Sequence, residues 1–198
     1  IVGEGLYAAC EVAAQNGLGQ HAGKASILSS LGRALAEMDP FVAQTAQELL
    51  FGAATLGHLP VEAIPPGVEP RVRRVVDEFL LDEVRSKPIG FYTWSAQLRS
   101  IFQQDRMLQG EIDAAGIKAI VNALQRDPVA RGAYESHLRF VSRLTNPFAN
   151  PDFRRLLDAI DRGSEDVSAE GIRFFPPSVA HETNIGKKLY GENPIPDG

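Results

Sequence analysis

Apolar residues recur at helical spacing along almost the whole chain. Residues three and four positions apart share one face of an α-helix, so such a stripe predicts a helix that buries one side. Leu28, Leu31, Leu35 and Met38 form one of these stripes. The apolar–polar alternation that is typical of strands is nearly absent. We therefore expect an all-α fold, a single multi-helix domain of about eight or nine helices with no significant sheet.

Several helix starts are marked by Asp or Asn before a proline. The side-chain oxygen of an N-cap residue accepts a backbone N–H of the first turn, and proline fits the first helical position because an N–H there has no helical partner. Asp39-Pro40, Asp127-Pro128 and Asn150-Pro151 predict such starts. The helices are expected at residues 5–16, 24–38, 40–56, 70–86, 94–108, 113–126, 128–144, 151–161 and 178–190.

Two stretches do not fit a helix. Residues 57–69 are rich in proline and are the best candidate for a boundary within the chain, although we expect one helical domain over residues 1–198. Residues 162–177 are expected to be extended and to lie across the helices, because Phe174 and Phe175 favour burial. The residues expected in the core are Leu28, Leu31, Leu35, Phe79, Leu80, Ile101, Phe102, Ile120, Leu124, Leu138, Leu156 and Leu157.

Composition argues against several classes of protein. The net charge of −5 argues against a general nucleic-acid binder, which usually carries a basic stripe. The single cysteine, Cys10, excludes a disulfide framework and is expected to be a small core residue. The uncharged run from Leu49 to Val61 is too short to span a bilayer, so we expect no membrane partner. Both ends suggest a piece of a longer chain or assembly, and no feature of the sequence assigns a cellular compartment.

Motifs for cofactor and metal chemistry are incomplete. Residues 3–8 fit the G-x-G-x-x-A pattern, but at most two strand residues precede it, whereas a dinucleotide site needs a full strand. Residues 19–26 resemble a phosphate-binding loop, yet Leu18 replaces a required glycine and Ala25 replaces the hydroxyl that binds Mg²⁺. The helix expected at 178–190 lacks the second histidine of a zinc-protease motif. We therefore expect an interhelical loop at 19–26, no cofactor and no metal.

The segment from Pro88 to Ser95 holds the single tryptophan, Trp94, next to Tyr92 and Thr93. Aromatic side chains in a loop flanked by Pro and Gly line a pocket, anchor an interface or fill the core where helices meet. Thr93 is the predicted N-cap of the next helix, which carries Arg99. Tyr92, Trp94 and Arg99 are candidate ligand- or partner-binding residues, and a core plug is the alternative for Trp94.

The last predicted helix concentrates His, Glu, Thr, Asn, Lys and Tyr in one short element. His181 and Glu182 are the candidate catalytic residues, because an accessible histidine titrates near neutral pH and transfers protons. Asn184 and Tyr190 are candidate binding residues. We expect His181 and Trp94 to lie on one side of the domain, in one pocket or patch. A capped terminal helix at the surface is the alternative.

Two functions remain open. The first is a helical binding or interaction module, whose partner is a protein or the remainder of a longer chain. The second is an enzyme domain with a pocket between the aromatic loop at 91–95 and the helix at 178–190, in which His181 and Glu182 form an acid–base pair. Three arginines in the first turn of 70–86 also suit a small anionic ligand, because the helix dipole disfavours cations there.

Overall fold

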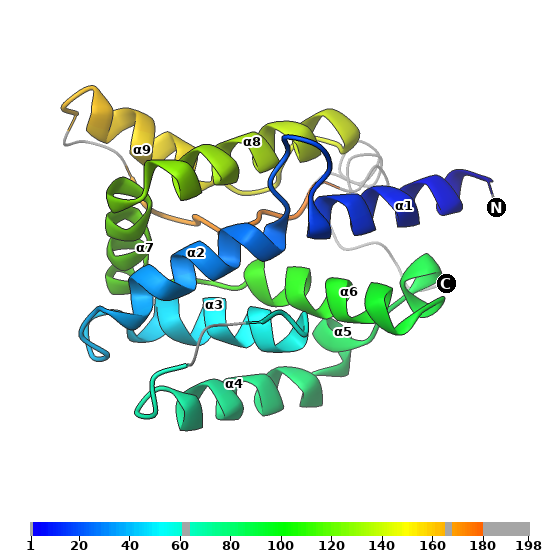
Figure 1. The fold of residues 1–198 in the computed structure, drawn as a ribbon, viewed down its shortest axis with the longest axis horizontal. Helices are drawn as coiled ribbons and strands as arrows, with labels where there is room; N and C mark the ends of the chain where they lie inside the picture. The colour runs from blue at the N-terminus through cyan, green and yellow to red at the C-terminus, as the bar shows by residue number, and fades with distance from the viewer. Residues whose placement is uncertain (1, 61–63, 165–167, 180–198) are drawn as a thin grey trace, which may run out of the picture.

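The helices stack in layers in the computed structural model, which describes residues 2–60, 64–164 and 168–179 (Figure 1). The elements are α1 (Val2–Asn16), α2 (Lys24–Ala36), α3 (Gln44–Leu56), α4 (Glu69–Leu81), α5 (Glu83–Ser86), the 3-10 turn η1 (Gly90–Thr93), α6 (Ala96–Leu108), α7 (Ala114–Arg126), α8 (Pro128–Leu144) and α9 (Phe153–Asp161). In these residues β pairing is limited to two isolated bridges, which confirms the all-α prediction. Across the same residues, no helix combines the length and apolar character needed to cross a membrane.

Helix α3 lies at the centre of the fold, between α4 and α2 (Figure 1). It also packs against α6 and α7, and nine of its 13 residues are buried. A helix that is apolar on all sides must be covered on all sides, which explains the uncharged run that begins at Leu49. Gly52 permits the close approach of α6, because a Cβ at this position would overlap the side chain of Met107.

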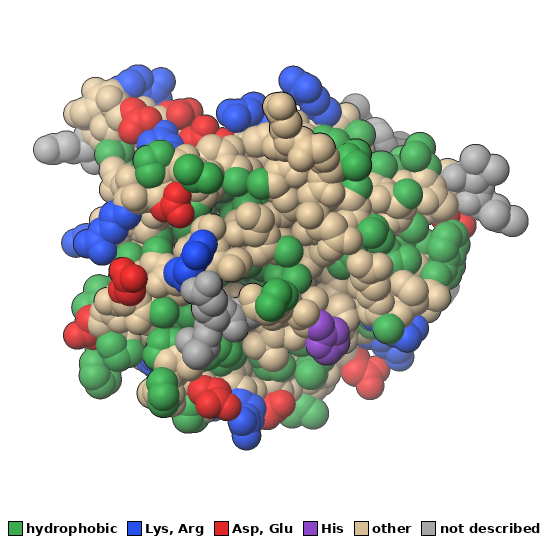
Figure 2. Space-filling view, viewed as in Figure 1, with side chains coloured by type: hydrophobic (Ala, Val, Ile, Leu, Met, Phe, Trp, Pro, Cys, Tyr) green, Lys and Arg blue, Asp and Glu red, His purple; other side chains and the backbone are tan. Residues whose placement is uncertain are grey.

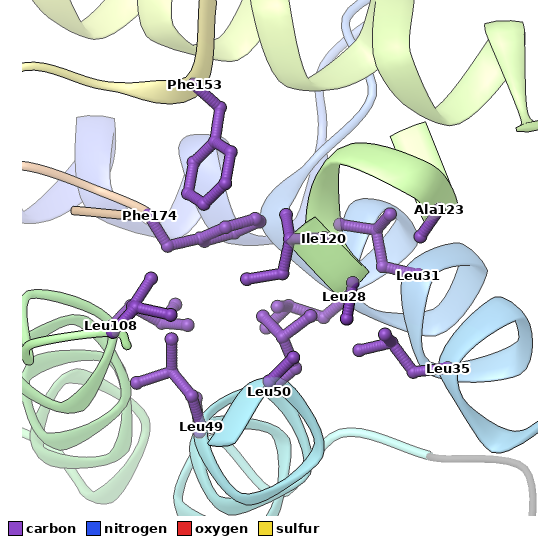
Figure 3. Close-up of a cluster of buried hydrophobic side chains, with 14 of the residues drawn as sticks. Leu28, Leu31, Leu35, Leu49, Leu50, Leu108, Ile120, Ala123, Phe153 and Phe174 are labelled. Carbon is purple, nitrogen blue, oxygen red and sulfur yellow. The ribbon is translucent and has the colours of Figure 1, made fainter. Parts of the chain in front are cut away.

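An extended stretch, residues 172–176, crosses the interior between the α8–α9 layer and helices α2, α3 and α6 (Figure 1). Ile172 and Phe174 are almost completely buried. Figure 3 shows the Phe174 ring beneath Phe153 and beside Ile120 in the main hydrophobic core. The prediction that this phenylalanine pair is buried across the helices is confirmed, but the backbone is not extended throughout, because it bends at Phe174 and Phe175.

The backbone of this stretch obtains hydrogen bonds from other parts of the chain. The hydroxyl of Tyr134 in α8 donates to the Phe174 carbonyl at 2.9 Å and accepts the Phe153 N–H at 3.3 Å. The Phe175 N–H donates to the Leu108 carbonyl at the end of α6, at 3.3 Å. Buried backbone groups need such partners, so Tyr134 fixes where the stretch passes.

Asp127 caps α8 as predicted, with one carboxylate oxygen accepting the N–H groups of Val129 and Ala130 at 3.0 and 2.9 Å. The start predicted at Asp39-Pro40 is wrong, because α3 begins at Gln44. The Asp39 carboxylate accepts backbone N–H groups just after it, but the residues that follow form a turn rather than a helix. The Asp39-Pro40 pattern therefore marks local hydrogen bonds of the cap type, but no helix begins there.

Two other predicted caps are displaced by two residues. The cap of α9 is Asp152 rather than Asn150, and the cap of α6 is Ser95 rather than Thr93. In both cases the residue that directly precedes the helix accepts a first-turn N–H. The Thr93 hydroxyl instead donates to the Gly90 carbonyl inside η1, at 2.8 Å.

The helix predicted at 70–86 divides at Asp82, whose ψ of 85° leaves the helical region. Leu80 was expected in the core and is 42% exposed, so that prediction is wrong. Helix α4 is an outer helix that packs mainly on α3 and α5, and Leu80 lies just beside its buried stripe. The stripe consists of Val72, Val76 and Phe79. The other predicted core residues are buried except Phe102, which is half-buried.

The helix predicted at 178–190 does not begin at Ser178, because Ser178 forms an isolated bridge with Phe148. The backbone of the residues on each side joins the same pairing: the Ala149 N–H donates to the Pro177 carbonyl at 2.8 Å. This pairing holds the stretch extended where a helix was expected. Residues 180–190 lie outside the described residues.

Replacing Tyr134 by Phe is expected to lower the free energy of unfolding by about 1–3 kcal/mol. The change leaves the Phe174 carbonyl and the Phe153 N–H buried without their common partner. Urea denaturation measures the loss. The same change at the exposed Tyr7 is the control and should have little effect. Equal stabilities for both variants would contradict the role given to Tyr134.

Replacing Asp127 by Ala is expected to lower the free energy of unfolding by about 0.5–2 kcal/mol, because the first turn of α8 loses its cap. Thermal or urea denaturation detects this change. Asp77→Ala, at an exposed position of α4, removes the same charge without removing a cap. A loss at Asp77 as large as that at Asp127 would show that charge rather than capping is responsible.

Candidate functional site

A cavity of about 610 Å³ lies between α1, η1, α6, α8 and residues 175–178. This volume is within the range of small-molecule sites. Figure 2 shows hydrophobic side chains gathered over α1 and the adjoining end of α8. The apolar part of the wall includes Leu6, Tyr7, Phe102, Leu138, Phe140, Val141, Phe148 and Phe175. Phe102 is half-buried because it lines this cavity rather than the core.

The α1–α2 loop, residues 17–23, brings Glu11 of α1 close to Lys24 of α2. Gly17 has a φ of +88°, a conformation that favours glycine. Gly23 packs on the backbone of Gly17, and a Cβ there would overlap it. These two glycines allow the tight turn. The interhelical loop predicted at 19–26 is confirmed for residues 19–23, whereas residues 24–26 already belong to α2.

Lys24 is the centre of a buried charge network on the cavity wall. Its side chain is 3% exposed, and its Nζ donates to both carboxylate oxygens of Asp105, at 2.8 and 2.6 Å. The nearest oxygen of Glu11, Oε2, lies 3.6 Å from Nζ. The Tyr92 hydroxyl donates to the other Glu11 oxygen at 2.9 Å. Two carboxylates therefore share one ammonium group.

Burial raises the pKa of Asp105, and the Lys24 ammonium opposes that rise. Burial also raises the pKa of Tyr92, and the negative charges of Glu11 and Asp105 raise it further. Tyr92 therefore keeps its proton at neutral pH and serves as a hydrogen-bond donor.

A pair of glutamines next to this network joins α1 to α6. The Gln15 amide donates to Gln104 at 2.8 Å, and the Gln104 amide donates back at 2.9 Å. Both side chains are buried. This pair of hydrogen bonds joins the inner end of α1 to α6 beside the buried Ala14.

His137 of α8 lies on the same wall, 3% exposed, and its Nδ1 is buried without a hydrogen-bond partner among the described residues. Its ring centroid lies 4.8 Å from that of Phe175 and 5.9 Å from that of His21. The pKa of His137 is lowered to about 3, chiefly by burial and in addition by the charges of Lys24 and His21. The imidazole is neutral at pH 7 and offers one donor and one acceptor nitrogen.

The candidate residues of the aromatic loop separate in the structure. Tyr92 lines the cavity. Trp94 is 54% exposed and lies outside the cavity lining, so it does not fill the core. Arg99 donates to the Thr93 carbonyl at 3.0 Å and supports η1 from the surface. Of this group, Tyr92 is the residue that the described structure joins to the polar network.

His181, Glu182, Asn184 and Tyr190 lie outside the described residues, so their proposed roles stay predictions. Ser178, close to the end of the described chain, lines the same cavity as Tyr92. The segment leading to the predicted acid–base pair therefore reaches the cavity.

The arginines at the start of α4 have partners within the chain. Arg71 donates to the Pro40 carbonyl at 3.2 Å and to Gln47 at 3.3 Å. Arg73 pairs with Glu69 at 2.9 Å. These contacts account for two of the three arginines without an anionic ligand.

Four polar residues of the cavity were not predicted from the sequence, although their positions in apolar stripes mark them as inward-pointing. Lys24 lies one turn before the Leu28–Leu35 stripe, where the next apolar residue would stand. Asp105 interrupts the stripe of α6 in the same way. His137 and Glu11 do so in α8 and α1. A polar side chain in line with an apolar stripe must point toward the interior.

A second cavity, of about 650 Å³, lies beside α3, α4 and α5. Its acidic residues include Glu78 and Glu111, which are exposed and have partners within the chain: Arg74 lies 3.9 Å from Glu78, and Arg173 donates to Glu111 at 2.9 Å. Within residues 2–60, 64–164 and 168–179, no group of three or more His, Cys, Asp or Glu could hold a metal ion. The cavity with the buried polar groups is the stronger candidate.

No family model matches the chain, and no curated protein or solved structure matches it either. Function is therefore inferred from the geometry of the cavity alone.

The stability of the protein is expected to fall by about 2 kcal/mol between pH 7 and pH 5 because of His137. Below pH 6.5 the unfolded chain binds a proton at this histidine, whereas the folded chain does so only near pH 3. The contribution of His137 to the free energy of unfolding is full above pH 6.5 and is lost as the pH falls toward 3. His137→Leu should remove this part of the pH dependence in urea denaturation at pH 5, 6 and 7.

His58→Asn is the matched control, because His58 is exposed. Its φ is +50°, a conformation that Asn tolerates better than most residues. This variant should keep the pH dependence of the unaltered chain. If His137→Leu also keeps it, His137 does not stay neutral in the folded state.

Proposed function

We propose that this chain is a small-molecule binding domain whose ligand occupies the cavity between α1, α6 and α8. The proposal depends mainly on one observation: the His137 imidazole on the wall of this apolar cavity is 97% buried, and its Nδ1 has no hydrogen-bond partner among the described residues. Leaving a buried polar group without a hydrogen bond costs about 1–3 kcal/mol. A ligand group that bonds the imidazole recovers this free energy.

The rest of the wall supports a ligand with an apolar body. Aromatic and aliphatic side chains surround a few polar groups that come from different helices. Small-molecule sites have this composition, because apolar contact supplies affinity and a few polar groups set orientation. This concave site supports the binding module of the sequence analysis, with a small molecule as its partner.

An enzyme domain is the second candidate function. It is favoured by Tyr92 and Ser178, which line one cavity, because Ser178 precedes the predicted acid–base pair His181 and Glu182 by three residues. A separate variant distinguishes the two functions. His181→Ala should leave ligand affinity unchanged if the domain only binds, and should abolish turnover of a bound substrate if the domain is an enzyme.

Filling the cavity should abolish ligand binding. Val141 lines the cavity on α8, so Val141→Trp is expected to weaken binding of the fluorescent apolar probe N-phenylnaphthylamine at least about tenfold. Fluorescence titration measures this change. Val129→Trp, at an exposed position of the same helix, is the matched control and should bind the probe normally.

Cys10 provides an independent readout, because it is the single cysteine and it lines the cavity. Bound probe should slow alkylation of Cys10 by iodoacetamide in the unaltered chain and in Val129→Trp, but not in Val141→Trp. Unchanged probe affinity in Val141→Trp, or no protection of Cys10, would refute this cavity as the binding site.

A further inference from the structure

The geometry points to a ligand that carries a cationic amine beside an aromatic or aliphatic body, and we infer that Glu11 pairs with that amine. This inference rests on the cavity being the binding site. It concerns the chemical class of the ligand and the residue that selects it.

The charge balance of the polar wall leaves Glu11 without an equivalent partner. Lys24 is bonded to both oxygens of Asp105 at 2.8 and 2.6 Å, so these two charges neutralise one another. Glu11 Oε2 lies 3.6 Å from the ammonium, beyond direct hydrogen-bond distance. Its other oxygen accepts a hydrogen bond from the neutral Tyr92 hydroxyl, at 2.9 Å. One negative charge therefore remains, on a side chain that is 28% exposed.

Two arginines also line the cavity, but neither forms an ion pair with Glu11 in the described structure. The Arg106 guanidinium donates to the Arg85 carbonyl at 3.3 Å and to Gln109 at 3.0 Å. Arg143 is exposed, where water and salt screen its charge. The local group of Glu11, Asp105 and Lys24 therefore carries one net negative charge. Arg106 is bonded to neutral groups and keeps its positive charge elsewhere on the wall.

Aromatic rings lie next to this carboxylate. Tyr92 bonds it directly, and the Tyr92 ring centroid is 5.1 Å from that of Phe102. Tyr7 lies one helical turn before Glu11 on α1 and also lines the cavity. Ring faces attract cations, so the same surroundings favour an ammonium group and its apolar body.

Three naphthalene compounds of nearly equal size test the inference, because they differ mainly in charge at neutral pH. Naphthylmethylamine is cationic, naphthylmethanol is neutral and naphthoate is anionic. Each is titrated against the chain with bound N-phenylnaphthylamine, and its displacement constant is measured. The amine is expected to bind at least about tenfold more tightly than the alcohol, and the acid is expected to bind most weakly.

Glu11→Gln should reduce the affinity of the amine about tenfold, to that of the alcohol, and leave the alcohol unchanged. Glu37→Gln removes the same charge at an exposed position at the far end of α2 from Lys24, and it should preserve the preference for the amine. The ranking of the three compounds on the unaltered chain tests the inference even if Glu11→Gln destabilises the fold.

Each outcome decides between the proposals. Preference for the amine that depends on Glu11 supports the inference. Tighter binding of naphthoate overturns it and assigns Arg106 and Arg143 as the ligand's charged contacts. Equal binding of all three compounds overturns it while leaving the cavity as the binding site. Failure of every compound and of N-phenylnaphthylamine to bind overturns the proposed function itself.

Discussion

The extended stretch from Ile172 to Pro176 runs through the interior without a helix or sheet to satisfy its backbone, and the fold is arranged around that need. The Tyr134 hydroxyl supplies part of these hydrogen bonds, because it donates to the Phe174 carbonyl and accepts the Phe153 N–H. One hydroxyl therefore ties α8, the start of α9 and the extended stretch together. The stretch passes beneath α8 and α9 (Figure 1), while α2 contacts α8 directly beside it.

The cavity follows from this arrangement. Where the extended stretch leaves the core, Phe175 and Ser178 form one wall, and α1 closes the opposite side through polar contacts. The buried imidazole of His137 is part of the wall of this cavity. Protein interiors are densely packed and contain few cavities of this size. Because polar groups line the wall of this cavity, a binding site explains it better than imperfect packing of the core.

The sequence predicted the architecture better than the site, for a physical reason. Apolar stripes such as Leu28–Leu35 predict burial directly, because the helical repeat places these residues on the one face that packs against the core. Caps were less certain: Asp39 makes its local hydrogen bonds without starting a helix. The stripes also mark Lys24 and Asp105 as inward-pointing, but their meeting depends on helix packing across 81 positions of sequence. Spacing along the chain carries no such information.

The docking of α1 has a consequence for how the cavity is reached. Of the α1 side chains whose burial is described, only Ala14 and Gln15 are buried, so little apolar surface holds this helix. Elements with few buried apolar contacts open at a free energy well below that of global unfolding. We therefore expect the amide hydrogens of α1 to exchange through local opening rather than global unfolding. The exposed side chains of Leu6 and Tyr7 on α1 line the cavity, so local opening of this helix is expected to widen the mouth of the cavity.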